Sequence, residues 1–237
     1  MHNDNPREVM LAIKDVSKIY KLGAVRVNAL DNVNLELRQH DFLTILGPSG
    51  SGKSTMLNML GALDRPTKGS ILLQGTNLAK LSDDELSKIR RYKIGFIFQF
   101  FNLIPTMNAI ENVMMPVSLV VKDKSKLKRK AEALLAEVGL AKRMNHRPTE
   151  LSGGEQQRVA IARSLISDPV IILADEPTGN VDSVTGEEII GLMSKLNKEQ
   201  GQTFVVVSHD TRITTISNRV IHIRDGRIAE SIETELK

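Results

Sequence analysis

One eight-residue segment has the composition of a loop that holds phosphate groups. Gly47 to Ser54 reads Gly-Pro-Ser-Gly-Ser-Gly-Lys-Ser and fits the pattern G-x-x-x-x-G-K-[ST] in full. The glycines let successive backbone N–H groups point at one anion at the start of a helix. Lys53 can reach the β- and γ-phosphates, and the Ser54 hydroxyl can bind Mg²⁺. The segment predicts nucleotide binding, but by itself it does not separate kinases, GTPases, motor ATPases and transporters.

Two adjacent carboxylates follow an apolar run. Val170 to Ala174 is apolar throughout and leads directly into Asp175 and Glu176. In a parallel sheet the carboxyl ends of the strands form the edge that binds ligands. Asp175 is suited to hold Mg²⁺ through water, and Glu176 is suited to polarise an attacking water. The alternative is that the two carboxylates belong to a solvated loop after a strand. The presence of a phosphate loop in the same chain makes this the weaker interpretation.

A second glycine-containing segment precedes another predicted helix. Leu151 to Gln156 reads Leu-Ser-Gly-Gly-Glu-Gln, in which Ser152 can cap the helix. The paired glycines allow another group to approach the backbone, and the helix start offers N–H donors and a positive dipole end. We therefore expect a second anion site about a hundred residues after the first. An ordinary capped helix explains the serine but not the glycine pair.

In this order the motifs resemble those of the ATP-binding subunits of ABC transporters. Ser152–Gln156 resembles the family signature, and Gly47–Ser54 and Val170–Glu176 resemble its Walker A and Walker B segments. Four further positions fit in sequence: Tyr20 where the family stacks an aromatic ring on adenine, Gln99 in the Q-loop, Val181-Asp182 in the D-loop, and Ser208-His209-Asp210 at the switch histidine. The resemblance covers nearly the whole chain.

Several stretches resemble the lipoprotein-release and macrolide-export branch in particular. They are Phe98–Pro105, Glu111–Val113, His146–Pro148 and Ala174–Asn180. Val181 stands where that branch commonly has Leu, and Ser208 where it commonly has Thr. Both replacements are nearly isosteric. The residues before Met10 form a tail to which the resemblance gives no role.

The resemblance implies a set of site residues. The positions implied to contact ATP are Tyr20, Gly47, Pro48, Ser49, Gly50, Ser51, Gly52, Lys53, Ser54, Thr55, Gln99, Ser152, Gly153, Gly154, Gln156, Asp182 and His209. The catalytic positions are Glu176, His209 and Lys53, and Mg²⁺ would be held by Ser54, Gln99 and Asp175.

The resemblance also implies partners. Two copies of the chain pair head to tail, so that the signature of one covers the ATP of the other. A separate transmembrane permease would be driven by this pair. The expected location is the cytoplasmic face of the cell membrane, as a peripheral subunit.

Composition limits the other possibilities. The chain has 237 residues, a net charge of +4 and no cysteine, which excludes disulfide scaffolds and cysteine-ligated zinc. No segment reaches the roughly 18 consecutive apolar residues that a membrane span needs. The N-terminus lacks the apolar stretch of a signal peptide. We expect an intracellular globular protein without a membrane span, and the mild basic excess gives little support for nucleic-acid binding.

The predicted elements alternate between strands and helices, which indicates an α/β fold of the P-loop NTPase class with a mostly parallel sheet. The sequence before the phosphate loop has strand patterns, which the resemblance implies form an N-terminal antiparallel β subdomain, and residues 107–140 have a helical pattern. We expect one domain over 1–237, with a RecA-like core and β subdomain in 1–93 and 168–237. The Q-loop and a helical signature subdomain would occupy about 94–167.

Two surface features have ordinary and functional interpretations. Phe96 and Phe98 are expected in the strand core, whereas Phe100, Phe101 or the Met114–Pro116 stretch could help form a groove for a transmembrane partner. The basic run from Lys122 to Lys130 is typical of a solvated helix face, with anionic lipid headgroups as the alternative partner.

Other functions stay open at this point. The same ATPase residues would serve a membrane complex that transmits force to periplasmic or cell-wall machinery. A soluble ABC protein of DNA repair or translation is disfavoured because those generally carry large insertions or two nucleotide domains. A stand-alone P-loop kinase is disfavoured by the signature and by His209.

Overall fold

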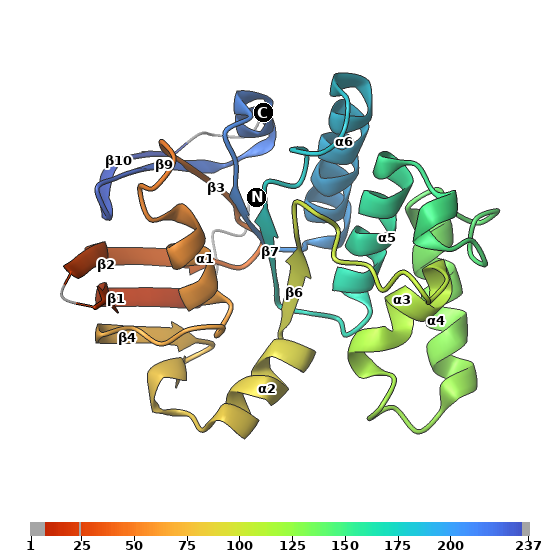
Figure 1. Ribbon diagram of the computed structural model, residues 1–237, viewed down its shortest axis with the longest axis horizontal. Coiled ribbons are helices and arrows are strands. Elements are labelled where there is room, and N and C mark those ends of the chain that lie inside the picture. The colour runs from red at the N-terminus through yellow and green to blue at the C-terminus, as the bar shows by residue number, and fades with distance from the viewer. Residues whose placement is uncertain (1–7, 24, 234–237) are drawn as a thin grey trace, which may run out of the picture.

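A six-stranded sheet runs through the centre of the computed structural model, which describes residues 8–23 and 25–233 (Figure 1). Its order is β10-β9-β3-β8-β7-β6, and every pair from β9 to β6 is parallel. The strands are β3 (Phe42–Leu46), β6 (Ile94–Ile97), β7 (Ile171–Asp175), β8 (Phe204–Val207), β9 (Arg219–Arg224) and β10 (Arg227–Glu233). The central strands are apolar runs because helices or sheet cover both of their faces.

Alternate residues of the central strands contribute to two hydrophobic cores. Ile172 and Val206 face α5 (Gly153–Leu165) and α6 (Ser183–Gln200), whereas Leu173 and Val205 pack with α1 (Lys53–Leu60) and the N-terminal strands. The two-residue period of a strand produces this division. The phosphate loop thus leads into α1 on one face of the sheet, and the signature forms the start of α5 on the opposite face.

A second, antiparallel sheet precedes and follows the phosphate loop in sequence. Its order is β2-β1-β4-β5, formed by β1 (Val9–Leu22), β2 (Val25–Arg38), β4 (Lys68–Leu73) and β5 (Thr76–Asn77). The expected α/β fold, with a parallel core and an N-terminal antiparallel subdomain, is confirmed. Residues 1–7 of the N-terminal tail lie outside the described residues.

The helical segment is broken where the sequence suggested continuity. Within 107–140 the structure has α3 (Ala109–Met114) and α4 (Lys124–Glu137), both of which contact α5 or each other. A 3-10 turn at Met115–Val117 and a loop separate them, because Pro116 cannot continue an α-helix. Before this segment, α2 (Asp83–Tyr92) starts with the expected capping box between Ser82 and Glu85.

Two element boundaries have identifiable physical causes. β6, within the range 94–167 expected for the Q-loop and the helical subdomain, is a strand of the central sheet because its backbone pairs with β7. Helix α6 starts at Ser183 because the Asp182 carboxylate accepts hydrogen bonds from the backbone N–H groups of Val184 and Thr185. Throughout 8–23 and 25–233, no helix has the combined length and hydropathy needed to cross a membrane.

Candidate nucleotide site

The carboxyl ends of four neighbouring parallel strands bring most of the predicted site residues to one edge of the sheet. Gly47 follows β3, Ser208 and His209 follow β8, Asp175 ends β7, and Gln99 lies two residues beyond β6. These segments are far apart in sequence but adjacent in the sheet. This edge is the usual ligand-binding edge of an open α/β sheet.

The phosphate loop is tightly enclosed at two of its glycines. A Cβ on Gly47 would lie 2.2 Å from the carbonyl oxygen of Ile223, and one on Gly52 would lie 2.3 Å from that of Ala29. Gly52 also has a positive φ of 107°, which side chains disfavour. Glycine is therefore required here to turn the backbone into the start of α1.

The Lys53 ammonium lies over the loop that precedes it. Its Nζ donates to the carbonyl oxygens of Gly47, at 2.7 Å, and Pro48, at 2.9 Å. Both acceptors are neutral, so an anionic phosphate oxygen would be a stronger acceptor for the same ammonium. The Ser51 hydroxyl, in the same loop, is buried without a hydrogen-bond partner among the described residues.

Asp175 is half-buried at the end of β7. Burial raises the pKa of this carboxyl above its usual range, and the negative charge of Glu176 raises it further. The positive charge of Lys53 acts in the opposite direction and lowers the pKa of Asp175. A cation at this position would relieve the cost of keeping Asp175 ionised.

Glu176 and His209 are in direct contact. The Nδ1 atom of His209 lies 2.8 Å from Oε2 of Glu176, and the same oxygen accepts from the Ser208 hydroxyl and the His209 backbone N–H at 3.2 Å each. Glu176 has a positive φ of 46°, an uncommon conformation for a non-glycine residue. The backbone turn and three polar contacts together fix this carboxylate.

Gln99 faces the loop that leads to α6. The Asn180 side chain donates from Nδ2 to the Gln99 carbonyl oxygen at 2.9 Å, and Gln99 Nε2 lies 3.5 Å from Asn180 Oδ1. The two predicted positions Gln99 and Asp182 are thus connected through Asn180, a residue to which the sequence analysis gave no role.

The signature segment is a well-capped helix start. The Ser152 hydroxyl accepts from the backbone N–H of Glu155, and the Glu155 carboxylate accepts from the backbone N–H of Ser152. A Cβ on Gly154 would lie 2.2 Å from Cγ2 of Thr185, so the second glycine is required for contact between α5 and α6. In Figure 1 the strands β6 and β7 lie between α5 and α1, and the two helices pack into the hydrophobic cores on opposite faces of the central sheet.

Tyr20 lies near α1, although its hydroxyl already has a partner. It donates to Asp64 Oδ2 at 2.9 Å, and the Lys18 ammonium lies 4.9 Å from the ring centroid. The hydroxyl of Thr55 on α1 also interacts with it. Burial and the Asp64 carboxylate raise the pKa of the Tyr20 hydroxyl. Asp64 carries no sequence signal of its own, and only the structure reveals it.

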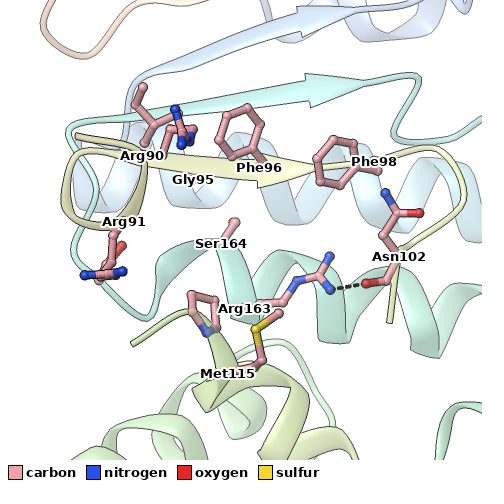
Figure 2. A pocket seen from close by; sticks show the side chains of 12 residues that line it. Arg90, Arg91, Gly95, Phe96, Phe98, Asn102, Met115, Arg163 and Ser164 are labelled. Carbon is pink, nitrogen blue, oxygen red and sulfur yellow. Dashed lines mark hydrogen bonds between the residues drawn. The ribbon is translucent and has the colours of Figure 1, made fainter. Parts of the chain in front are cut away.

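A cavity of about 320 Å³ lies between β6 and the helical segment (Figure 2). The Phe96 and Phe98 rings, stacked 5.7 Å apart, line one side, and Met115 and Arg163 line the other. Phe96 lies in β6 and packs against the core as expected, whereas Phe98 lies beyond the end of the strand, so the expectation of a strand-core position is wrong for Phe98. Phe100 and Phe101 are not among the lining residues, since β6 ends at Ile97 and the chain turns away, leaving Phe100 73% exposed.

Known proteins are similar to this chain in sequence and in fold. A family model described as ABC transporter matches residues 30–179, more than half of the chain. The chain is 46% identical over 222 residues to the lipoprotein-releasing system ATP-binding protein LolD of Shewanella denitrificans, covering 94% of this chain and 95% of that protein. It is 51% identical over 219 residues to the macrolide export ATP-binding/permease protein MacB of Bdellovibrio bacteriovorus, covering 92% of this chain and 33% of that longer protein.

A solved structure is similar to this chain over nearly its whole length. It is a dimeric, post-hydrolysis state of the ATP-binding cassette MJ0796 bound to ADP and Pi, from Methanocaldococcus jannaschii. The TM-score is 0.88 at 46% sequence identity, covering 96% of this chain and 99% of that chain.

Proposed function

This chain belongs to the ABC transporter family, and from that premise we propose how its residues divide the work of the subunit. The chain is an ATP-binding and ATP-hydrolysing cassette that pairs with a second copy and serves a transmembrane permease. The observation that carries the residue assignment is the sheet edge, where the phosphate loop, Asp175, Glu176 and His209 follow three adjacent parallel strands.

The phosphate loop and α1 bind the triphosphate. The backbone N–H groups of Gly47–Ser54 surround the β-phosphate, and Lys53 exchanges its carbonyl partners for phosphate oxygens. Thr55, in the first turn of α1, interacts with Tyr20, whose ring supports the adenine. The hydrogen bond to Asp64 holds the Tyr20 ring in place for that contact.

Ser54, Asp175 and Gln99 fit a magnesium ion. Their oxygens are a hydroxyl, a carboxylate and an amide, the hard donors that Mg²⁺ prefers together with phosphate and water. Mg²⁺ takes six oxygen ligands, so phosphate and water would supply those that these three side chains do not. When bound, Mg²⁺ neutralises charge on the β- and γ-phosphates.

Glu176 and His209 serve the hydrolytic step. Three contacts hold the Glu176 carboxylate in position. From there it orients the attacking water and accepts its proton. The His209 side chain is 73% exposed, so it is accessible to a γ-phosphate bound beside Glu176. Lys53 stabilises the negative charge that develops on the transferred phosphoryl group.

The signature acts on the partner's nucleotide. The signature residues Ser152, Gly153, Gly154 and Gln156 form the start of α5, which packs on the face of the sheet opposite α1. A second chain placed head to tail would bring them to an ATP. The start of α5 then adds N–H donors and a positive dipole end to the γ-phosphate. Asp182, which caps α6 beside the signature, faces the same interface.

The cavity in Figure 2 is the docking place for the permease. Its aromatic and Met115 walls suit an apolar helix end, and Arg90, Arg91 and Arg163 line it. Arg163 donates to the backbone carbonyl oxygens of Asn102 and Phe101, and Arg90 donates to that of Ala62. These acceptors are neutral, so an acidic group on the permease would be a stronger partner for the arginines. We place the permease in the lipoprotein-release or macrolide-export branch, and the chain at the cytoplasmic face of the membrane as a peripheral subunit.

The experiment is light scattering on Glu176→Gln after size-exclusion chromatography. We expect a monomer without nucleotide, a dimer with ATP and Mg²⁺, and a smaller dimer fraction when EDTA removes the metal. The control is Glu199→Gln, because Glu199 is an exposed carboxylate at the far end of α6. The control should keep wild-type ATP hydrolysis. Wild-type hydrolysis by Glu176→Gln would contradict the role given to Glu176, and a Glu176→Gln protein that stays monomeric with ATP would contradict the shared site.

A further inference from the structure

The turn between β9 and β10 contacts the phosphate loop, although it belongs to the last part of the chain. The backbone N–H of Gly226 donates to the Ser51 carbonyl oxygen at 2.9 Å. The Gly226 carbonyl oxygen accepts from the backbone N–H of Asp31, on β2, also at 2.9 Å. One residue of the turn is therefore hydrogen-bonded both to the phosphate loop and to the N-terminal sheet.

The sequence gives this turn a defined shape. Arg224 pairs with Arg227 across the hairpin, so Asp225 and Gly226 form a two-residue loop. Both loop residues have a positive φ, 50° and 75°, which is the conformation that Asp-Gly adopts in a tight hairpin turn. A Cβ on Gly226 would lie 3.0 Å from the Ala29 carbonyl oxygen. The turn thus fits closely against β2.

An ion pair joins the turn to β2. The Arg227 guanidinium donates to Oδ2 of Asp31 from Nε at 2.9 Å and from Nη2 at 2.5 Å. The two side chains are 70% and 35% exposed, so the pair adds little to the stability of the fold. Asp31 is also the residue whose backbone N–H bonds to Gly226. The ion pair therefore reinforces the backbone contact that locates the Gly226 N–H beside Ser51.

The hydrogen bond to Ser51 sets the direction of a phosphate-binding group. In a trans peptide, the carbonyl oxygen of one residue and the N–H of the next residue point in opposite directions. Gly226 holds the Ser51 carbonyl oxygen toward the hairpin, so the N–H of Gly52 is directed away from the hairpin. Backbone N–H groups at the start of a helix bind phosphate only when they converge on it.

The same hairpin borders the other end of the phosphate loop. A Cβ on Gly47 would lie 2.2 Å from the carbonyl oxygen of Ile223, on β9. β9 also pairs in parallel with β3, the strand that leads into the loop. The hairpin thus contacts the loop at its first glycine and at Ser51, and its own place is fixed by the ion pair to β2.

We propose that Asp31 and Arg227 are positioning residues for nucleotide binding. The inference rests on the proposed function, in which the phosphate loop binds the β-phosphate. The ion pair keeps Gly226 against Ser51 and so keeps the Gly52 N–H oriented before the nucleotide arrives. Such orientation in advance strengthens binding, because less ordering is needed when the ligand binds. It leaves the hydrolytic step at the ends of β7 and β8 unchanged.

The test measures binding of ADP with Mg²⁺ to the full-length chain by isothermal titration calorimetry. ADP carries the β-phosphate but no γ-phosphate, so its binding is separated from ATP hydrolysis and from ATP-driven pairing. Wild type is compared with Asp31→Asn, with Arg227→Gln, with the double variant, and with the exchanged pair Asp31→Arg and Arg227→Asp. Steady-state ATP hydrolysis gives kcat and KM, and thermal unfolding gives stability.

The matched control is Arg224→Gln. Arg224 precedes the same turn, its side chain is 78% exposed, and it lies 4.0 Å from the Asp225 carboxylate. It pairs across the hairpin with Arg227 but is not the residue that bonds to Asp31. The control therefore removes a positive charge from the same hairpin without breaking the proposed contact, and it should match wild type in every measurement.

Each single variant should raise the Kd for ADP about three- to fivefold, the range of one partly exposed ion pair. The double variant should show the same increase, because either change alone already breaks the pair. The exchanged pair should have a lower Kd than either single variant. KM for ATP should rise with the Kd, whereas kcat and the unfolding temperature should stay near their wild-type values.

Three results would overturn the inference. The first is an unchanged Kd for ADP in both single variants. The second is a double variant whose increase equals the product of the two single increases, since the two side chains would then act separately. The third is a rise in Kd that always accompanies a comparable loss of folded protein. A wild-type chain that binds no ADP would instead overturn the proposed function of the phosphate loop, which the same titration reveals.

Discussion

His209 Nδ1 lies 2.8 Å from Oε2 of Glu176, yet the two side chains differ greatly in exposure, at 73% for His209 and 16% for Glu176. The carboxylate is largely buried, and the imidazole that contacts it is largely accessible to solvent. Such a pair can act on a substrate without supporting the fold, because the exposed partner buries little apolar surface.

We expect His209→Ala to separate activity from stability. The value of kcat should fall by roughly a hundredfold or more, since a positioned proton-transfer or phosphate contact is lost. Stability should change by no more than about 0.5 kcal/mol, as for other exposed positions. Steady-state kinetics and thermal unfolding check both, with His146→Ala in the helical segment as the control. A parallel loss of stability and activity would show that the histidine supports the fold instead.

Gly154 and Thr185 give a second prediction, because a Cβ on the glycine would lie 2.2 Å from the threonine Cγ2. Gly154→Ala should destabilise the protein by about 1–3 kcal/mol, as overpacking does. The double variant Gly154→Ala with Thr185→Ser should recover most of that loss, since serine lacks the methyl group but keeps the hydroxyl bonded to Asp182. Chemical denaturation measures this. Absence of recovery in the double variant would show that the two side chains do not compete for the same space.

The glycine pair also shows where sequence reasoning stops. The pattern Ser152-Gly153-Gly154 indicated a helix start open to an anion, and the capped start of α5 agrees with it. The pattern does not show that Thr185, thirty-one residues later, occupies the space that a side chain at Gly154 would need. A local motif reports on local backbone chemistry. Contacts between α5 and α6 depend on how the sheet places them, which is non-local information.

Other parts of the fold followed from the sequence for physical reasons. Apolar runs such as Val170–Ala174 and Thr203–Val207 marked buried parallel strands, and the residues after them reached one edge because parallel strands end together. The break between α3 and α4 and the cavity-lining role of Phe98 were missed. Both depend on how residues 94–123 pack beside α5. The hydrophobic period of a helix, 3.6 residues, or of a strand, 2 residues, carries no information about that packing.

An exposed glycine inside α6 gives a third prediction. Gly191 lies within Ser183–Gln200, and a Cβ there would meet no atom within 4 Å. Gly191→Ala should raise stability by about 0.5–1 kcal/mol, because glycine has a lower helix propensity than alanine. ATP hydrolysis should stay at the wild-type level. A decrease in stability, measured by denaturant unfolding, would mean that this side of α6 is packed against something in solution.

The last prediction concerns acid stability and the residue after the switch histidine. Arg212 donates to both carboxylate oxygens of Asp210, at distances from 2.7 to 3.1 Å, and Thr178 donates at 3.2 Å. The hydrogen bonds from Arg212, with the smaller contributions of its charge and of Thr178, hold the pKa of Asp210 below its usual range. The folded state thus binds a proton at Asp210 less readily than the unfolded chain does.

The sign of the effect follows from that difference. A carboxyl with a depressed pKa in the folded state stabilises the protein above its unfolded pKa of about 3.9, and this contribution is lost as the pH falls through the lower folded value. Asp210→Asn keeps the cap on the following 3-10 turn at Thr211–Ile216 but removes the charge. At neutral pH the variant should therefore unfold at a lower temperature than wild type, and the gap should close below about pH 4.

Thermal unfolding of wild type and Asp210→Asn from pH 7 to pH 3 measures this gap. Asp225→Asn is the matched control, because that carboxylate is 95% exposed in the β9–β10 turn and its nearest cation lies 4.0 Å away. The control should follow wild type at every pH. A gap between Asp210→Asn and wild type that stays constant down to pH 3 would show that the Arg212 contacts depend on side-chain shape and not on the ionised carboxylate.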